Sequence, residues 1–195
     1  MRQNLKHFYV YGFDDIHHSK EELLKAKQSF NFDEINLTIH ENSRVHISTC
    51  NREEVYFISE ISPTVTGLGF LYNGLEAHTK LLKTLLGLNT ALFADKQIFA
   101  QIKKCFKQNQ KKVRLTEDIQ NIFYDSFSTA KKIGKEINLL EYESAISRIF
   151  FEKILKGRSG YESIAIVGTG QMAKEFLDYL QQKKHQFVEF YGRDF

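Results

Sequence analysis

Apolar and polar residues alternate along the chain with two different periods, and each change of period marks the boundary of a predicted element. Period-two stretches that are rich in aromatic and β-branched residues predict strands at 7–13, 45–49 and 55–58. Apolar residues at helical spacing predict helices at 19–30, 75–86, 95–108, 118–135 and 141–155. The stretch 61–74 contains the only proline and three glycines, which predicts a loop or an irregular crossover.

A different pattern begins near the C-terminal end. A continuous apolar strand at 163–167 leads into a Gly-x-Gly-x-x-Ala string and a helix at 174–182, and a second strand follows at 187–191. In this setting the string is a dinucleotide fingerprint, because its glycines permit a tight turn and close approach to a pyrophosphate. The predicted cofactor-binding residues are Gly168, Thr169, Gly170, Gln171 and Met172.

Two residues after the last predicted strand bear on the choice of cofactor. Arg193 lies roughly 20 residues past the glycines, where an arginine favours the extra phosphate of NADPH. Asp194 beside it is suited instead to a ribose hydroxyl, as in NADH. We predict NADPH, and the two neighbours leave NADH as the alternative.

These elements predict an α/β fold with three parts. An N-terminal α/β domain with a mixed sheet and a helical layer is expected at 1–140, a connecting helix at 141–160 and a partial Rossmann-type unit at 161–195. Two strands and one helix cannot build a doubly wound sheet, since their apolar faces lack neighbours. We therefore expect a fragment of a longer protein, or a homodimer or other partner that covers the exposed edge.

Composition narrows the class of protein. The chain has 195 residues, of which 42% are hydrophobic and 26% charged, as in soluble globular proteins. No apolar run approaches the ~20 residues of a membrane span, and the N-terminus does not read as a signal peptide, so we predict a cytoplasmic protein without membrane contact. Two cysteines make neither a disulfide framework nor a metal site, and a net charge of +3 does not by itself indicate nucleic acid.

The most informative chemistry lies in the string Ser48-Thr49-Cys50-Asn51-Arg52, which we expect in a tight turn between two strands. A cysteine becomes a good nucleophile where positive charge or hydrogen-bond donors favour its thiolate, and Arg52 and the local hydroxyl groups can supply both. Arg52 is equally suited to bind a carboxylate through two parallel hydrogen bonds. The alternative is a cysteine at a strand end with an arginine on the surface.

This string and the four residues after it resemble the signature of glutamyl-tRNA reductases, with Glu53 where the family has threonine. The resemblance implies NADPH-dependent reduction of glutamyl-tRNA to glutamate-1-semialdehyde, the first step of tetrapyrrole biosynthesis. It also implies that Cys50 attacks the ester carbonyl to form a thioester, that Arg52 holds the glutamate carboxylate, and that Thr49 and Asn51 shape the pocket. Splitting the reaction in this way provides a better hydride acceptor than an ester.

The resemblance extends further along the chain with more substitutions. Residues Gly87-Leu88-Asn89-Thr90 and the stretch containing Gln97, Ile98 and Gln101 match in register, which implies a substrate-binding role for Gln101. The active-site histidine of the family falls on Lys80, and His78 two residues earlier is the candidate catalytic replacement or else a solvated or capping residue. The loop Asp14 to His17 and Gly134, which stands for a family arginine, also differ.

Five lysines on and beyond one predicted helix form a basic strip, namely Lys103, Lys104, Lys107, Lys111 and Lys112. The strip is suited to tRNA phosphates, but a solvated helix face has the same pattern. Three hypotheses remain: a reductase of this family, a divergent and catalytically impaired paralogue that binds or regulates in tetrapyrrole metabolism, and an unrelated NADP-binding fragment. A buried Cys50 far from any cleft would favour the third.

Overall fold

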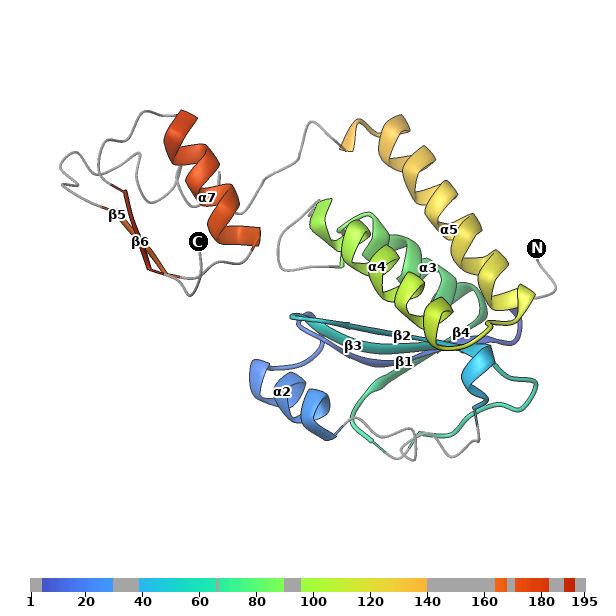
Figure 1. Ribbon diagram of the computed structural model, residues 1–195. Helices are drawn as coiled ribbons and strands as arrows, with labels where there is room; N and C mark the ends of the chain where they lie inside the picture. Colours follow the sequence, from blue (N-terminus) through green and yellow to red (C-terminus); the bar gives the residue numbers. More distant parts are fainter. Residues whose placement is uncertain are drawn as a thin grey trace. The chain divides into compact units, whose positions relative to one another are not determined.

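A computed structural model describes residues 5–29, 39–65, 67–89, 96–139, 164–167, 171–182 and 188–191 of the chain. The chain divides into two compact units, residues 1–143 and 144–195, which are described separately (Figure 1). The predicted helix at 141–155 and the connector at 141–160 lie outside the described residues. No helix in the described part of the chain has the length and apolar composition that crossing a membrane requires.

Unit 1 is built on a four-stranded sheet in the order β2-β3-β1-β4. The strands are β1 (Phe8–Asp14), β2 (Arg44–Thr49), β3 (Arg52–Ile58) and β4 (Phe70–Asn73), and a short 3-10 helix, η2 (Glu41–Ser43), precedes β2. The α/β class is confirmed, but all three strand pairs are antiparallel, whereas a mixed sheet was predicted. The connection between β2 and β3 explains part of this difference, because a two-residue turn can join only antiparallel strands.

Strand β4 lies within the stretch predicted to be a loop or crossover. It is four residues long, pairs with β1 at the edge of the sheet and is only half-buried over most of its length. Its hydrophobic pattern is therefore weak, and the glycines and proline before it dominate the sequence signal. Strand β1 also runs further than predicted, through Gly12 to Asp14.

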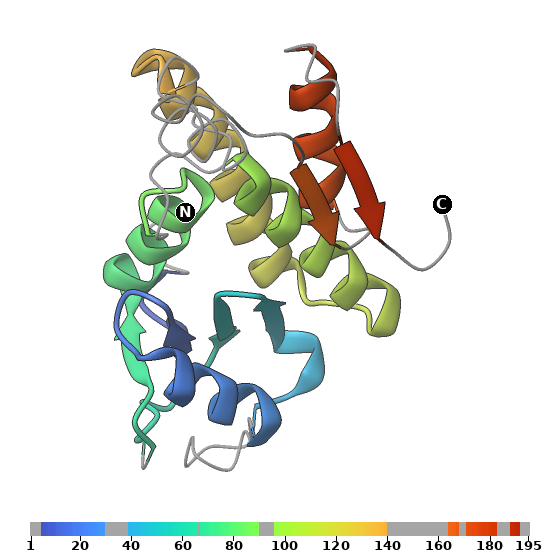
Figure 2. The same cartoon turned by 90° about the vertical axis from the view of Figure 1, so that its left-hand side faces the viewer.

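One face of the sheet is covered by α2 (Lys20–Ser29), which begins at the predicted cap Ser19. The amide of Glu22 donates to the Ser19 hydroxyl at 3.3 Å and the Ser19 amide donates to the Glu22 carboxylate at 2.8 Å, which is a reciprocal capping box. Leu23 and Ala26 of this helix pack on the aromatic and branched residues of β1 and β3 that point to this side. Figure 2 shows α2 below the sheet.

The other face is covered by three helices, α3 (Gly74–Leu85), α4 (Lys96–Lys112) and α5 (Glu117–Glu136), as predicted within a few residues (Figure 1). The main core lies between these helices and the sheet and includes Val10, Ile47, Leu81, Ile102 and Phe123, all 0% exposed. Phe106 of α4 stacks on Phe123 of α5 with ring centroids 4.9 Å apart. At one end of this sheet face the core contains charged residues instead of apolar ones, and the candidate site lies there.

Unit 2 contains a strand, a helix and a strand as predicted: β5 (Ile164–Val167), α7 (Gln171–Gln182) and β6 (Val188–Tyr191). The two strands pair in parallel, with Ile164 opposite Val188. The helix begins three residues before the predicted start at 174, directly after Gly170, so it includes the last three positions of the Gly-x-Gly-x-x-Ala string. Ala173, the last position of that string, is 9% exposed.

Candidate active site

Cys50 lies in the turn between β2 and β3. Thr49 and Arg52 form the last register pair of the two strands, so Cys50 and Asn51 are the two loop residues of a hairpin. The Cys50 residue is exposed, as a nucleophile for an external substrate requires. This confirms the predicted turn, and the exposure of Cys50 removes the observation that would have favoured the unrelated-fragment hypothesis.

Three hydrogen bonds tie the backbone of this turn to neighbouring segments. The Lys27 ammonium of α2 donates to the carbonyl oxygens of Thr49 and Cys50, the latter at 2.6 Å. The Asp15 amide donates to the carbonyl oxygen of Asn51 at 3.1 Å. The turn is therefore fixed to α2 on one side and to the loop after β1 on the other, with a positive charge beside Cys50. No feature of the sequence singled out Lys27.

Arg52 follows the turn, and its guanidinium is already engaged within the protein. The side chain is 0% exposed. Its Nη1 lies 3.2 Å from both Glu54 Oε1 and Thr84 Oγ1, and its Nη2 donates to the carbonyl oxygen of Asn89 at 2.8 Å. Of the three guanidinium nitrogens, only Nε has no hydrogen-bond partner among the described residues. The geometry thus differs from the prediction of an arginine open to a substrate carboxylate, because Glu54 occupies that place.

Lys80 of α3 completes a buried group of four charges with Arg52, Glu54 and Asp14. Its ammonium forms an ion pair with Asp14 and lies 3.3 Å from Glu54 Oε1, and all four side chains are at most 4% exposed. Two cations and two carboxylates balance one another, which meets the requirement that buried charges be paired. Asp14 and Arg52 face each other in the register of β1 and β3.

The pairing is reflected in two shifted pKa values. Burial raises the pKa of Asp14, but the Lys80 ammonium and the hydrogen bonds from Lys80 and His17 outweigh it and lower that pKa to about 2. Burial, together with the adjacent Glu54 carboxylate, raises the pKa of Tyr56 well above 10.0. The Tyr56 hydroxyl donates to Glu54 Oε2 at 2.9 Å and stays protonated. The carboxylates of Asp14 and Glu54 therefore each have more than one hydrogen-bonding or ionic partner.

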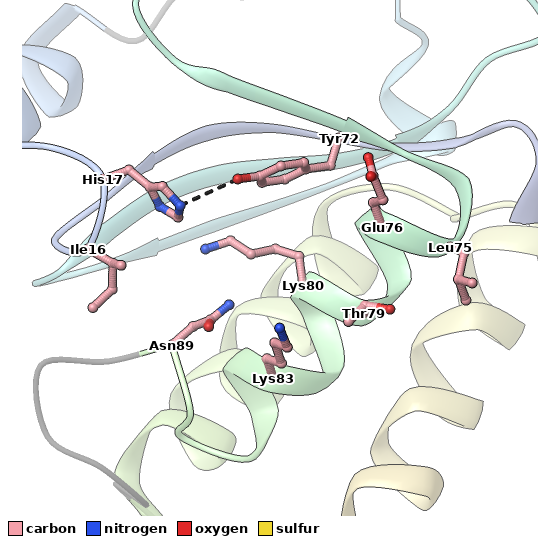
Figure 3. A pocket seen from close by; sticks show the side chains of 9 residues that line it. All are labelled: Ile16, His17, Tyr72, Leu75, Glu76, Thr79, Lys80, Lys83 and Asn89. Atoms are coloured by element: carbon pink, nitrogen blue, oxygen red, sulfur yellow. Dashed lines mark hydrogen bonds between the residues drawn. The ribbon is translucent and has the colours of Figure 1, made fainter.

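A pocket of about 430 Å³ opens beside this charged group (Figure 3). In Figure 3 the Lys80 side chain extends toward His17 and Tyr72, whose hydroxyl lies 3.4 Å from His17 Nε2. The lining side chains come from the loop after β1, from β4, from α3 and from the segment after it: Ile16, His17, Tyr72, Leu75, Glu76, Thr79, Lys80, Lys83 and Asn89. Ile16 follows Asp15, whose amide binds the Cys50 turn, so the pocket and the hairpin share one loop.

Other predicted site residues lie elsewhere in unit 1. His78 points to α5, where its Nε2 lies 3.1 Å from Ser126 Oγ. Because that hydroxyl donates to the Ile122 carbonyl at 2.6 Å, the His78 ring must be the donor of their bond. Burial lowers the pKa of His78 and keeps the ring neutral. His78 therefore packs between α3 and α5, whereas Lys80, two residues later, contacts Asp14 and Glu54, and a catalytic role of His78 stays a prediction.

Thr49, Asn51 and Gln101 were also predicted to bind substrate. Thr49 is half-buried and its hydroxyl accepts from the Asn51 amide at 3.4 Å, so both residues shape the turn. Gln101 lies half-buried in α4. None of the three lines the pocket. The sequence analysis did not select Glu54 and Asp14 as site residues. Each lies at a strand position whose neighbours two residues away face the core, and this period-two pattern was the signal that could have identified them.

The predicted cofactor residues Gly168, Thr169, Gly170 and Arg193 lie outside the described residues. Gln171 and Met172 are the first two residues of α7. In the sequence, the two glycines of the string therefore fall between β5 and α7, and the strands on either side of that helix are parallel, as a dinucleotide fingerprint requires.

Comparison with known proteins places this geometry in context. Residues 4–137 match the family model described as "Glutamyl-tRNAGlu reductase, N-terminal domain". The glutamyl-tRNA reductase of Chlamydia pneumoniae is 23% identical over 162 residues, which are 76% of this chain and 48% of that protein. The solved structure of glutamyl-tRNA reductase from Methanopyrus kandleri matches with a TM-score of 0.59 at 19% identity, over 97% of this chain and 50% of that one. The chain thus spans about half the length of these relatives, and the structural match supports the fold.

Proposed function

The chain belongs to the glutamyl-tRNA reductase family, through the N-terminal domain that residues 4–137 match, and we propose that Cys50 accepts the glutamyl group of glutamyl-tRNA as a thioester. The observation that carries this proposal is the exposed Cys50 in a two-residue hairpin that hydrogen bonds fix on both sides. A nucleophile on a rigid support keeps its position relative to a bound substrate. Because the chain covers about half of its relatives, the complete reaction is part of the proposal.

The acyl transfer is balanced without a co-reactant. The Cys50 sulfur forms a bond to the carbonyl carbon while the bond from that carbon to the terminal ribose oxygen of the tRNA breaks. The thiol proton ends on the ribose hydroxyl, and free tRNA leaves. The product is a glutamyl thioester on Cys50, which can be isolated if no hydride donor is present.

The adjoining pocket supports a site for the glutamyl group. Lys83 is exposed on α3 at this pocket, and His17 faces it from the loop after β1. Lys83 can meet a carboxylate, whereas His17 Nδ1 is bound to Asp14 and the buried Arg52 is held by Glu54 and the Asn89 carbonyl. In this proposal Arg52 is a positioning residue, since it joins the strand that follows Cys50 to the segment that closes the pocket.

The second half of the reaction reduces the thioester to glutamate-1-semialdehyde, the first step of tetrapyrrole biosynthesis. We propose NADPH as its cofactor, which supplies the hydride when bound. Support comes from the parallel strand, helix and strand of unit 2, with the two glycines of the string between β5 and α7 in the sequence. Gly168, Thr169 and Gly170 lie outside the described residues, so NADPH rests on the fingerprint and its setting.

The experiment that tests the proposal is trapping of the thioester. The protein is mixed with glutamyl-tRNA that carries labelled glutamate, without NADPH, and the intact mass is measured. We expect one glutamyl adduct that is absent in Cys50→Ser and present in Cys105→Ser, since Cys105 is the only other cysteine and is half-buried in α4. No adduct with folded protein and verified charged tRNA would overturn the proposal.

A second candidate function has its own supporting observation. Lys80, at the position of the family's active-site histidine, has its ammonium between the carboxylates of Asp14 and Glu54, so it is engaged in ion pairs within the protein. A catalytically impaired paralogue that binds glutamyl-tRNA and regulates tetrapyrrole metabolism fits this arrangement. Retained binding of glutamyl-tRNA without a Cys50 adduct is the result that distinguishes it.

A further inference from the structure

The solvent side of α4 carries four exposed lysines, Lys103, Lys104, Lys107 and Lys111, which we call the lysine strip. Their spacing of one, three and four residues places them on one side of the helix. With Ala100 and Gln108 they line a hollow of about 470 Å³ at the surface. From Lys103 to Lys111 the helix rises about 12 Å, so the strip can contact more than one phosphate of a nucleic acid.

The opposite side of α4 is fastened to β2, the strand that leads into Cys50. The Asn109 side chain accepts from the His46 amide at 3.1 Å and donates to the His46 carbonyl at 2.8 Å. One turn earlier, the Cys105 thiol lies 3.5 Å from the carbonyl oxygen of Ser48. Moving toward the N-terminus of α4 therefore means moving along β2 toward Cys50. The lysine strip therefore follows the course of β2 on the far side of α4, and its Lys103 end lies toward the Cys50 turn.

The charge of α4 distinguishes it from an ordinary solvated helix. Its 17 residues include six lysines and no acidic residue. Lys103, Lys107 and Lys111 repeat at a spacing of four, where like charges destabilise a helix by ~0.2–0.5 kcal/mol per pair. In contrast, α2 and α5 each have one exposed lysine paired with an acidic residue at that spacing, Lys25 with Glu21 and Lys132 with Glu136. None of the ion pairs among the described residues involves the strip.

We propose that the lysine strip binds the phosphate backbone of the tRNA that delivers its glutamyl group to Cys50. A polyanion converts the repulsion between the lysines into attraction and releases counterions from the RNA. That the aminoacylated end of the tRNA reaches Cys50 rests on the proposed function. Binding of phosphates by the lysine strip does not depend on acyl transfer.

The test compares two double variants with the same change of charge. In Lys107→Gln/Lys111→Gln the strip loses two lysines, and in Lys20→Gln/Lys25→Gln two exposed lysines are lost from α2, on the opposite face of the sheet. Binding of uncharged tRNA to the full chain is measured by fluorescence anisotropy between 50 and 200 mM salt. Each lost phosphate contact lowers the slope of log K against log salt by ~0.7–0.9.

We expect the strip variant to reduce this slope by about 1.5, so that the weakening of binding between 50 and 200 mM salt becomes about tenfold smaller. The α2 variant should keep the wild-type slope. Equal slopes in the two double variants, or an unchanged slope in the strip variant, would overturn the proposal.

A second measurement separates this proposal from the acyl-transfer proposal. A small glutamate α-phenyl ester has no phosphates, so it should acylate Cys50 at the same rate in wild type and Lys107→Gln/Lys111→Gln, while transfer from glutamyl-tRNA becomes slower in the variant. A slope change without any Cys50 adduct would overturn only the acyl transfer. If the strip variant forms the adduct from glutamyl-tRNA as fast as wild type at every salt concentration, only the proposal that the lysine strip binds the tRNA would be overturned.

Discussion

Replacement of Lys80 by methionine tests whether the buried charges are as tightly coupled as their geometry indicates. Lys80 is 4% exposed, and its ammonium contacts both Asp14 and Glu54. Methionine keeps most of the side-chain volume and removes the charge. Glu54 retains Arg52 and the Tyr56 hydroxyl, so Asp14 becomes the carboxylate without a balancing cation.

The expected cost follows from that unbalanced carboxylate. Removing one partner of a buried ion pair typically costs ~3–5 kcal/mol, and the remaining hydrogen bonds from the His17 and Ile16 amides to Asp14 place this case at about 3 kcal/mol. Lys83→Met is the matched control, because Lys83 lies on the same helix and pocket but is exposed, and its loss should change the stability by at most ~0.5 kcal/mol.

Hydrogen exchange of peptides from β1 and β3, read by mass spectrometry, measures the free energy of opening of unit 1 alone. Adding Asp14→Asn to the Lys80→Met chain should recover at least ~1 kcal/mol, since the two side chains interact directly. The deficit of Lys80→Met should also be smaller at pH 4 than at pH 7, because burial without Lys80 favours the protonated Asp14. A loss below ~1 kcal/mol, or one equal to that of Lys83→Met, would refute the coupling.

Two further predictions concern single groups. The folded-state pKa of Asp14, about 2, lies below its ordinary 3.8, so this carboxylate stabilises unit 1 by about 2 kcal/mol above pH 4, and the contribution disappears as the pH falls toward 2. Hydrogen exchange measured between pH 4 and pH 2 should show this loss of stability in wild type and not in Asp14→Asn. For His78→Leu we expect a loss of about 1 kcal/mol from the missing bond to Ser126, with the yield of the Cys50 adduct unchanged; an adduct lost with the fold intact would restore His78 as a catalytic candidate.

Local patterns predicted the parts of the fold that depend on local physics. The Ser19 cap, the amphipathic helices α3 to α5 and the Cys50 turn follow from neighbouring residues and appear at the predicted places. Gly12 shows the limit of such reasoning. The strand pattern includes this glycine but does not explain it: within β1 a Cβ at this position would be 2.4 Å from the carbonyl oxygen of Glu53 on β3. Close approach of two backbones is a tertiary property that a single segment does not reveal.

The site was predicted less well, because its charges are paired over long sequence distances. The sequence singled out Arg52 as a candidate site residue, but its partners Thr84 and Asn89 come from α3 and the segment after it. Two residues of one helix, His78 and Lys80, face different elements, and only the packed structure shows that Lys80 lies at the pocket. Sequence spacing gives the side of a helix but not the neighbour that this side will meet.

Glu53 connects these observations to the nucleophile. Side chains alternate along β3, so Glu53 points to the face opposite Arg52 and Glu54. There its carboxylate pairs with His46 and accepts from the Ser48 hydroxyl at 2.7 Å, so it binds two residues of the strand that leads into the turn. A threonine, which the resembling signature has at this position, has no carboxylate to reach both. Glu53, the one residue that differs from that signature, therefore stabilises the hairpin on the face of the sheet opposite Arg52. As a result, contacts on both faces of the sheet hold the backbone that carries the exposed Cys50 thiol.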